Sequence, residues 1–99
     1  MLYMISYDLN NEDDELGGPS YEDLYEALRY LGKCYPCTES TWIVDTEVSL
    51  QGVSKVVEQN IDGDDEVMIA DITCSDVTGR LSKNAEKWIR ARKESYRSF

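Results

Sequence analysis

The sequence predicts a single α+β domain. Four short segments are rich in apolar residues in the pattern of strands, and three other segments repeat apolar residues at helical spacing. The chain has 99 residues, which is the length of one domain, and its apolar content of 41% is sufficient for a folded core. We find no internal repeat and no linker, so one domain over residues 1–99 is expected.

The first part of the chain predicts a strand over residues 2–8 that ends on the carboxylate of Asp8. A loop over residues 9–19 follows. Ser20 has the side chain of a helix N-cap, and apolar residues then recur at helical spacing as far as Leu31. Gly32 is the expected end of this helix.

The middle of the chain predicts two strands and a second helix. The segment 33–40 has weak strand character, and Pro36 indicates an edge strand because proline cannot donate to a ladder. Residues 41–45 form a clear strand. Ser49 is the expected cap of a helix that ends near Asn60. Four of its side chains are expected to point inward: Leu50, Val53, Val56 and Val57.

The last part predicts a turn over residues 62–65, a strand over 66–73 and a helix that Ser82 caps. The apolar face of this helix consists of Leu81, Ala85, Trp88 and Ile89. The order of the first six elements is the ferredoxin-like βαββαβ pattern, here with an added C-terminal helix over about 82–95. That pattern places the first and third strands at the centre of the sheet, so the strand with Pro36 lies at an edge, as proline requires.

Charge is unevenly distributed along the chain. Residues 1–78 hold 18 acidic and 3 basic side chains, whereas residues 79–99 hold 2 acidic and 7 basic ones. This asymmetry predicts two surfaces with different partners, or a basic segment that docks on an acidic face of another subunit.

Several function classes are excluded or disfavoured. The chain has no histidine, so a Ser/His/Asp triad is impossible, and it has no phosphate-cradling glycine loop. Cys34 and Cys37 form a CxxC with only Cys74 besides, which is too few ligands for a zinc site and predicts ordinary reduced thiols. No apolar run can span a bilayer and no signal peptide is evident, so a cytoplasmic protein without membrane contact is expected.

The chain resembles a known family in four short features. These are Tyr7-Asp8-Leu9 at the end of the first strand, the helix stop at Gly32, the segment 39–44 and the strand at 66–73. Together they resemble the family of the small CRISPR adaptation subunit, the partner of the integrase, with its SinR-type relatives and the VapD-like toxin ribonucleases. The resemblance covers roughly residues 1–73. It implies a ferredoxin-like homodimer in nucleic-acid metabolism or defence, whose members include metal-dependent nucleases and structural platforms.

The resemblance implies one site residue, Asp8, as the ligand of a divalent cation and the catalytic carboxylate of a nuclease. Carboxylates suit Mg²⁺, which needs only one or two of them from the protein. The alternative is a strand-end aspartate that caps the following loop. Residues 12–15 are all acidic, where basic residues often follow in the family. Acidic side chains there repel phosphates, and a solvated loop is the expectation for them.

The C-terminal helix carries the candidate nucleic-acid-binding residues, Lys83, Lys87, Arg90 and Lys93. Arg92 and Arg97 belong to the same basic segment, and Tyr96 and Phe99 are candidates for stacking on bases. The alternative is a solvated helix face that pairs with acidic residues of a sister subunit.

Three functions therefore stay open. The first is a homodimeric nucleic-acid-binding protein, with Mg²⁺-dependent endonuclease activity as its enzymatic version. The second is a non-enzymatic acidic protein of the phage-inhibitor type, which imitates nucleic-acid phosphates and occupies the groove of a nucleic-acid-binding protein. The third is a regulatory dimer that binds a small ligand between its subunits.

Overall fold

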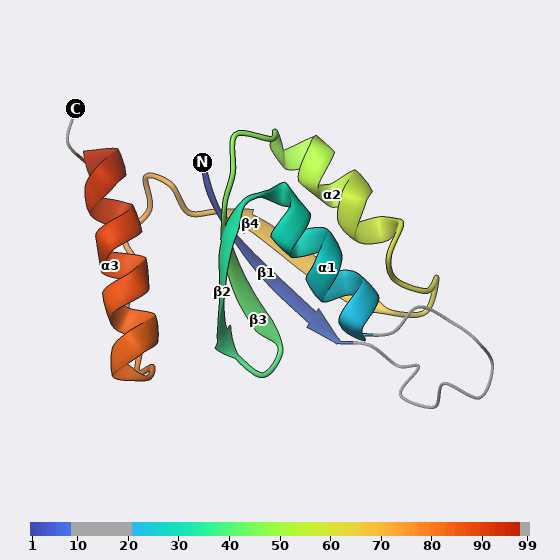
Figure 1. Ribbon diagram of the computed structural model, residues 1–99, viewed down its shortest axis with the longest axis horizontal. Helices are drawn as coiled ribbons and strands as arrows, with labels where there is room; N and C mark the ends of the chain where they lie inside the picture. The colour runs from blue at the N-terminus through green and yellow to red at the C-terminus, as the bar shows by residue number, and fades with distance from the viewer. Residues whose placement is uncertain (9–20, 98–99) are drawn as a thin grey trace.

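The computed structural model describes residues 1–8 and 21–97 (Figure 1). Over these residues it is a small α+β structure with a four-stranded antiparallel sheet and three helices. In chain order the elements are β1 (Leu2–Asp8), α1 (Tyr21–Leu31), β2 (Lys33–Thr38), β3 (Thr41–Asp45), α2 (Leu50–Glu58), β4 (Glu66–Asp71) and α3 (Lys83–Arg97).

The strand order in the sheet is β2-β3-β1-β4. The central strand β1 pairs antiparallel with both β3 and β4, with Ile5 opposite Trp42 on one side and Ile69 on the other. The predicted edge position of the strand with Pro36 is confirmed, since β2 pairs only with β3. Its register shifts between Pro36 and Thr38, where the ladder is irregular.

One face of the sheet is covered by α1 and α2, and the main core lies between them (Figure 1). Alternate residues of β1 point into this core, as the period of a strand requires. Leu24 and Leu28 of α1 are fully buried against them. The buried residues of this core are Tyr3, Ile5, Tyr7, Leu24, Leu28, Trp42, Val44, Val53 and Val57.

The opposite face of the sheet is covered at one end by α3. Leu2, Ile43, Ile72 and Ile89 form a second buried cluster there. Trp88 packs on Tyr35 of β2, with ring centroids 5.7 Å apart. The predicted apolar face of the last helix is thus confirmed, and it docks α3 on the sheet instead of leaving it free. Toward the other end of the same face Met68 is 61% exposed.

Most local predictions are confirmed, with small differences at the ends of elements. The Ser49 hydroxyl accepts from the amide of Gly52 at 3.2 Å, and the Ser82 hydroxyl accepts from that of Ala85 at 3.2 Å, so both caps are present. The predicted cap Ser20 lies outside the described residues. Leu50 was expected to point inward, and this is wrong: it is 38% exposed in the first turn of α2, where only the next turns reach the sheet.

Three other ends also differ. β2 ends at Thr38, α2 ends at Glu58, and β4 ends at Asp71, each two residues before the predicted end. At β4 the Thr73 amide and hydroxyl both donate to the Asp71 carboxylate, at 3.0 and 2.6 Å. The Ile72 amide still donates to the Leu2 carbonyl, but the Leu2 amide donates to the Thr73 hydroxyl and not to a backbone oxygen, so the ladder ends here. The two bonds from Thr73 hold the pKa of Asp71 below its usual value.

Candidate nucleic-acid interface

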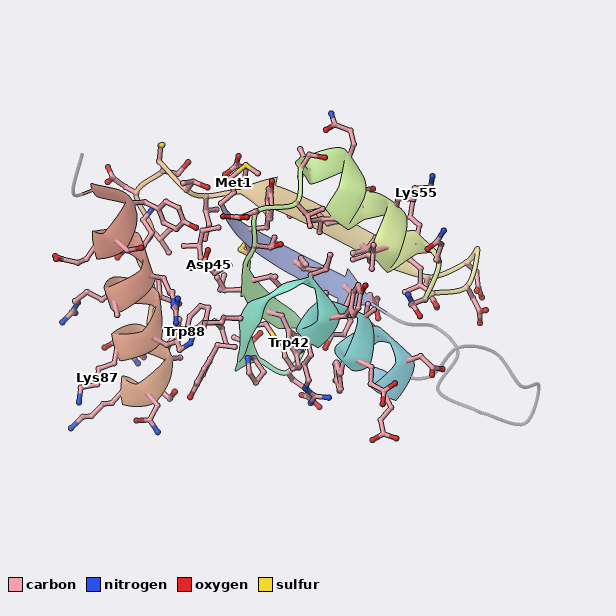
Figure 2. The ribbon with its side chains drawn as sticks, turned by 45° about the horizontal axis from the view of Figure 1, so that its top comes forward. Met1, Trp42, Asp45, Lys55, Lys87 and Trp88 are labelled. Atoms are coloured by element: carbon pink, nitrogen blue, oxygen red, sulfur yellow. The ribbon has the colours of Figure 1, made fainter. Side chains whose placement is uncertain are left out.

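A row of three cations lies on the exposed side of α3. Lys83, Lys87 and Arg90 follow one another at spacings of four and three residues, so they share one face of the helix. All three are exposed, and none takes part in an ion pair within the residues that the structure describes. Figure 2 shows Lys87 pointing away from the sheet, while Trp88 points toward it. These three side chains are therefore accessible on one side of the helix.

Arg80 extends this row toward the start of α3. It is exposed and lies three residues before Lys83, in the extended segment that leads into the helix. The sequence prediction did not include it, although its spacing from Lys83 was the available signal. We call Arg80, Lys83, Lys87 and Arg90 the basic row.

Arg92 lies on the other side of α3 and has a structural role. Its guanidinium is 3.3 Å from the Asp45 carboxylate and 5.3 Å from the centre of the Trp88 ring. Tyr96, a predicted base-stacking residue, donates its hydroxyl hydrogen to the same carboxylate and accepts from the amino group of Met1 at 2.7 Å. Both residues therefore bind α3 to the sheet and are not part of the basic row.

The prediction that Lys93 binds phosphate is wrong, because its side chain is buried and points toward the sheet. The residue is only 7% exposed, and its ammonium donates to the carbonyl oxygens of Ile72 at 2.6 Å, Thr73 at 3.2 Å and Ser75. An ammonium has three donors, so none is left for a phosphate. Its position four residues after the buried Ile89 was the sequence signal for this inward direction.

Three further predicted features cannot be placed in the structure. Phe99 and the acidic residues 12–15 lie outside the described residues, as does the side chain of Arg97.

Asp8 is the exposed last residue of β1, as predicted, and it lies directly opposite Glu66 of β4. Residues opposite each other in an antiparallel pair point to the same face of the sheet. The two carboxylates therefore form a pair, which is as many as Mg²⁺ usually takes from a protein. Over residues 1–8 and 21–97 no group of three or more metal-binding side chains is found.

Asp8 and the basic row lie at opposite ends of the sheet (Figure 1). The start of β1 contacts α3 through Leu2, and Asp8 is six residues further along the strand, about 20 Å away. The first turn of α1, the end of α2 and the turn before β4 are at the Asp8 end as well. Together with the second turn of α1 and the first residue of β4, these segments carry eight carboxylates: Glu22, Asp23, Glu26, Glu58, Asp62, Asp64, Asp65 and Glu66. The molecule therefore has an acidic end and a basic end, and Asp8 and α3 do not form one site.

The two cysteines of the CxxC lie on different faces of the sheet. Cys34 packs against the core under α1 and α2, whereas Cys37 packs against the second cluster under α3, so the two thiols face opposite sides of the sheet. Side chains alternate between the two faces of a strand, so two cysteines three residues apart point to opposite faces. Burial raises the pKa of both thiols, which keeps them protonated at neutral pH. The prediction of ordinary thiols agrees with this geometry.

No family model, curated protein or solved structure matches this chain. The resemblance to the small CRISPR adaptation subunit therefore stays a prediction. Among the described residues, no helix combines the length and the apolar character needed to cross a membrane.

Proposed function

We propose that this protein binds the phosphodiester backbone of nucleic acid through the basic row on α3. The observation that supports this most directly is the exposure of Lys83, Lys87 and Arg90 at one helix face without competing ion pairs among the described residues. Lysine and arginine neutralise phosphates and release their counterions, which is the main source of affinity for nucleic acid. The acidic end of the molecule repels the same backbone, so contact is restricted to α3 and its surroundings.

We propose further that the α+β structure is a ferredoxin-like fold with an added helix, which acts as a homodimer in nucleic-acid metabolism or defence. The alternation of strands and helices and the central position of β1 and β3 support the fold. The exposed Met68 and the edge position of β4 in the sheet support a second subunit on that side.

The enzymatic version of this proposal uses Asp8 with Glu66 as ligands of Mg²⁺, which activates water for attack on a phosphodiester. The two carboxylates fit the donor requirement of this ion. Both carboxylates lie at the acidic end, far from the basic row. A single subunit is therefore expected to bind nucleic acid through the basic row without cleaving it.

The test is a binding titration with a labelled oligonucleotide, followed by fluorescence anisotropy. The double variant Lys83→Ala/Lys87→Ala is compared with Lys33→Ala/Lys55→Ala, which removes the same charge from exposed lysines of β2 and α2. We expect at least a tenfold loss of affinity for the first variant only, from two lost phosphate contacts. Equal losses in both variants would show that net charge, and not α3, determines binding.

The second candidate function is imitation of nucleic-acid phosphates by the acidic end. The observation that favours it is the concentration of carboxylates around the end of β1, opposite to α3. A basic groove on a nucleic-acid-binding protein would accept this end. The test is capture of such a protein, its release by added DNA, and its loss with Glu22→Gln/Glu26→Gln. Tight binding of nucleic acid by the wild type without capture of a basic partner would exclude this function.

A further inference from the structure

A groove of about 300 Å³ lies between α3 and the extended segment that precedes it. Val77, Leu81 and Ile89 supply its apolar surface, and its charged lining residues are Glu86, Arg90, Lys93 and Glu94. Val77 is 44% exposed although it is a large apolar side chain. The volume is at the lower limit of small-molecule sites, which are typically about 300–1,000 Å³.

The segment that forms one wall of this groove is held in place by Lys93. The Lys93 ammonium bonds the carbonyl oxygens of Ile72, Thr73 and Ser75, so residues 72–75 are fixed to the middle of α3. At the other end of the segment, Ser82 caps α3 through the amide of Ala85. Both ends of the wall are thus attached to the helix that forms the opposite wall, and the groove is preformed.

The groove adjoins the basic row, and Arg90 belongs to both. Lys83 and Lys87 lie on the same helix face as Arg90. A phosphate on these cations would be next to the apolar surface of Val77 and Leu81. The occupant expected there therefore has a negatively charged backbone and an uncharged, flat, largely apolar side group with a polar edge.

We propose that this groove binds one unpaired base of a single-stranded nucleic acid whose phosphates lie on the basic row. The inference rests on the proposed function and adds the class of nucleic acid to it. In a duplex the bases are stacked and paired, so only a single strand can insert one between α3 and residues 77–81. The faces of the base contact Val77, Leu81 and Ile89, and Arg90 pairs with the adjoining phosphate.

The Glu86 carboxylate gives this groove a preference among bases. A carboxylate only accepts hydrogen bonds, so it favours cytosine, whose amino group offers two donor hydrogens. Thymine offers only its ring N–H, which lies between two carbonyl oxygens that repel a carboxylate. The expected preference for oligodeoxycytidine over oligothymidine of equal length is about threefold to tenfold, from one hydrogen bond. Because both oligonucleotides have the same backbone, the ratio of their affinities is independent of the phosphate contacts.

The experiment measures dissociation constants for oligodeoxycytidine, oligothymidine and a duplex of the same length. We expect the single strands to bind more tightly than the duplex, because only an unpaired base can bury its faces against the apolar side chains of the groove. Glu86→Leu should bring the ratio of the two single strands to about one, while the matched variant Glu26→Leu on α1 leaves it unchanged. Val77→Ala should weaken binding of single strands and leave that of the duplex unchanged.

The outcomes separate this inference from the function on which it rests. If the duplex binds as tightly as the single strands and Lys83→Ala/Lys87→Ala weakens both, the basic row is correct and the base site is overturned. If Glu86→Leu leaves the ratio unchanged, the assignment of Glu86 is overturned. If no oligonucleotide binds to the wild type, the proposed function and the base site both fail.

Discussion

Tyr96 in the last turns of α3 donates its hydroxyl hydrogen to the carboxylate of Asp45, the last residue of β3. The two residues are 51 positions apart in the sequence. Asp45 also pairs with Arg92 at 3.3 Å and lies 3.9 Å from the amino group of Met1. One carboxylate at the end of the sheet therefore holds the helix that carries the basic row.

Tyr96→Phe should lower the free energy of unfolding by about 1–3 kcal/mol, because a hydrogen bond to a charged group is lost. Urea unfolding of the two proteins measures the difference. Tyr30→Phe is the control, since Tyr30 is 89% exposed on α1. An equal effect of the two substitutions would mean that the hydroxyl of Tyr96 does not stabilise the docked helix.

Stability at alkaline pH should depend on the same hydroxyl. Burial, together with the Asp45 carboxylate, raises the pKa of Tyr96 to about 12. The folded state then keeps a proton that the unfolded state loses near pH 10, so this contribution to stability is complete below about pH 10 and is lost as the pH rises through about 12. Unfolding measured across this range should show a smaller alkaline loss for Tyr96→Phe than for the wild type.

The sequence predicted the strands and helices well because each has a local cause. Ser49 and Ser82 cap their helices, Pro36 requires an edge, and β1 alternates between two buried faces. None of these features depends on a distant residue. The same holds for the exposed positions of Lys83, Lys87 and Arg90, which follow from the apolar face opposite to them.

The roles of Lys93, Arg92 and Tyr96 could not be predicted in the same way, because their partners are far away in the sequence. Three carbonyl oxygens after β4 accept from Lys93, and Asp45 on β3 binds the other two residues. A basic helix without known partners suggests that all its cations face the solvent. Because α3 docks on the sheet, some of its cations have structural partners and the others are exposed to solvent.

Lys93→Met should destabilise the protein by about 1–3 kcal/mol, because buried carbonyl oxygens lose their donor while the volume of the side chain is kept. Lys87→Met, the same change at an exposed position of α3, should have little effect. Thermal unfolding measures both. If Lys87→Met is the more destabilising of the two, the buried ammonium has no structural role.

Binding of a single strand should weaken with salt according to the number of phosphates that the basic row contacts. Four contacts, one for each cation of the basic row, give a slope of about −3 in a plot of the logarithm of the association constant against that of the salt concentration. Lys87→Ala should reduce the steepness by about 0.7. The control Lys55→Ala on α2 should leave the slope unchanged, and an equal reduction in this control would mean that the strand also contacts α2.

Asp8→Ala should leave oligonucleotide binding unchanged, because Asp8 is about 20 Å from the start of β1 and so from α3. It should also raise stability slightly, by less than about 1 kcal/mol, since Asp8 faces the like charge of Glu66 across the ladder. Anisotropy and urea unfolding measure the two effects, with Glu26→Ala as the control for the loss of an exposed carboxylate. A loss of affinity like that of Lys83→Ala/Lys87→Ala would place Asp8 in the interface.

Cleavage is the separate test of Asp8 as a metal ligand. Labelled RNA and DNA are incubated with Mg²⁺ or Mn²⁺ and with the wild type, Asp8→Ala or Glu66→Gln. If the carboxylate pair holds the ion that activates water, both substitutions remove the metal-dependent cleavage, while binding by the basic row is retained. Equal cleavage by all three proteins would exclude Asp8 from any mechanism, because a nuclease cannot retain its rate without the ligand of its catalytic ion.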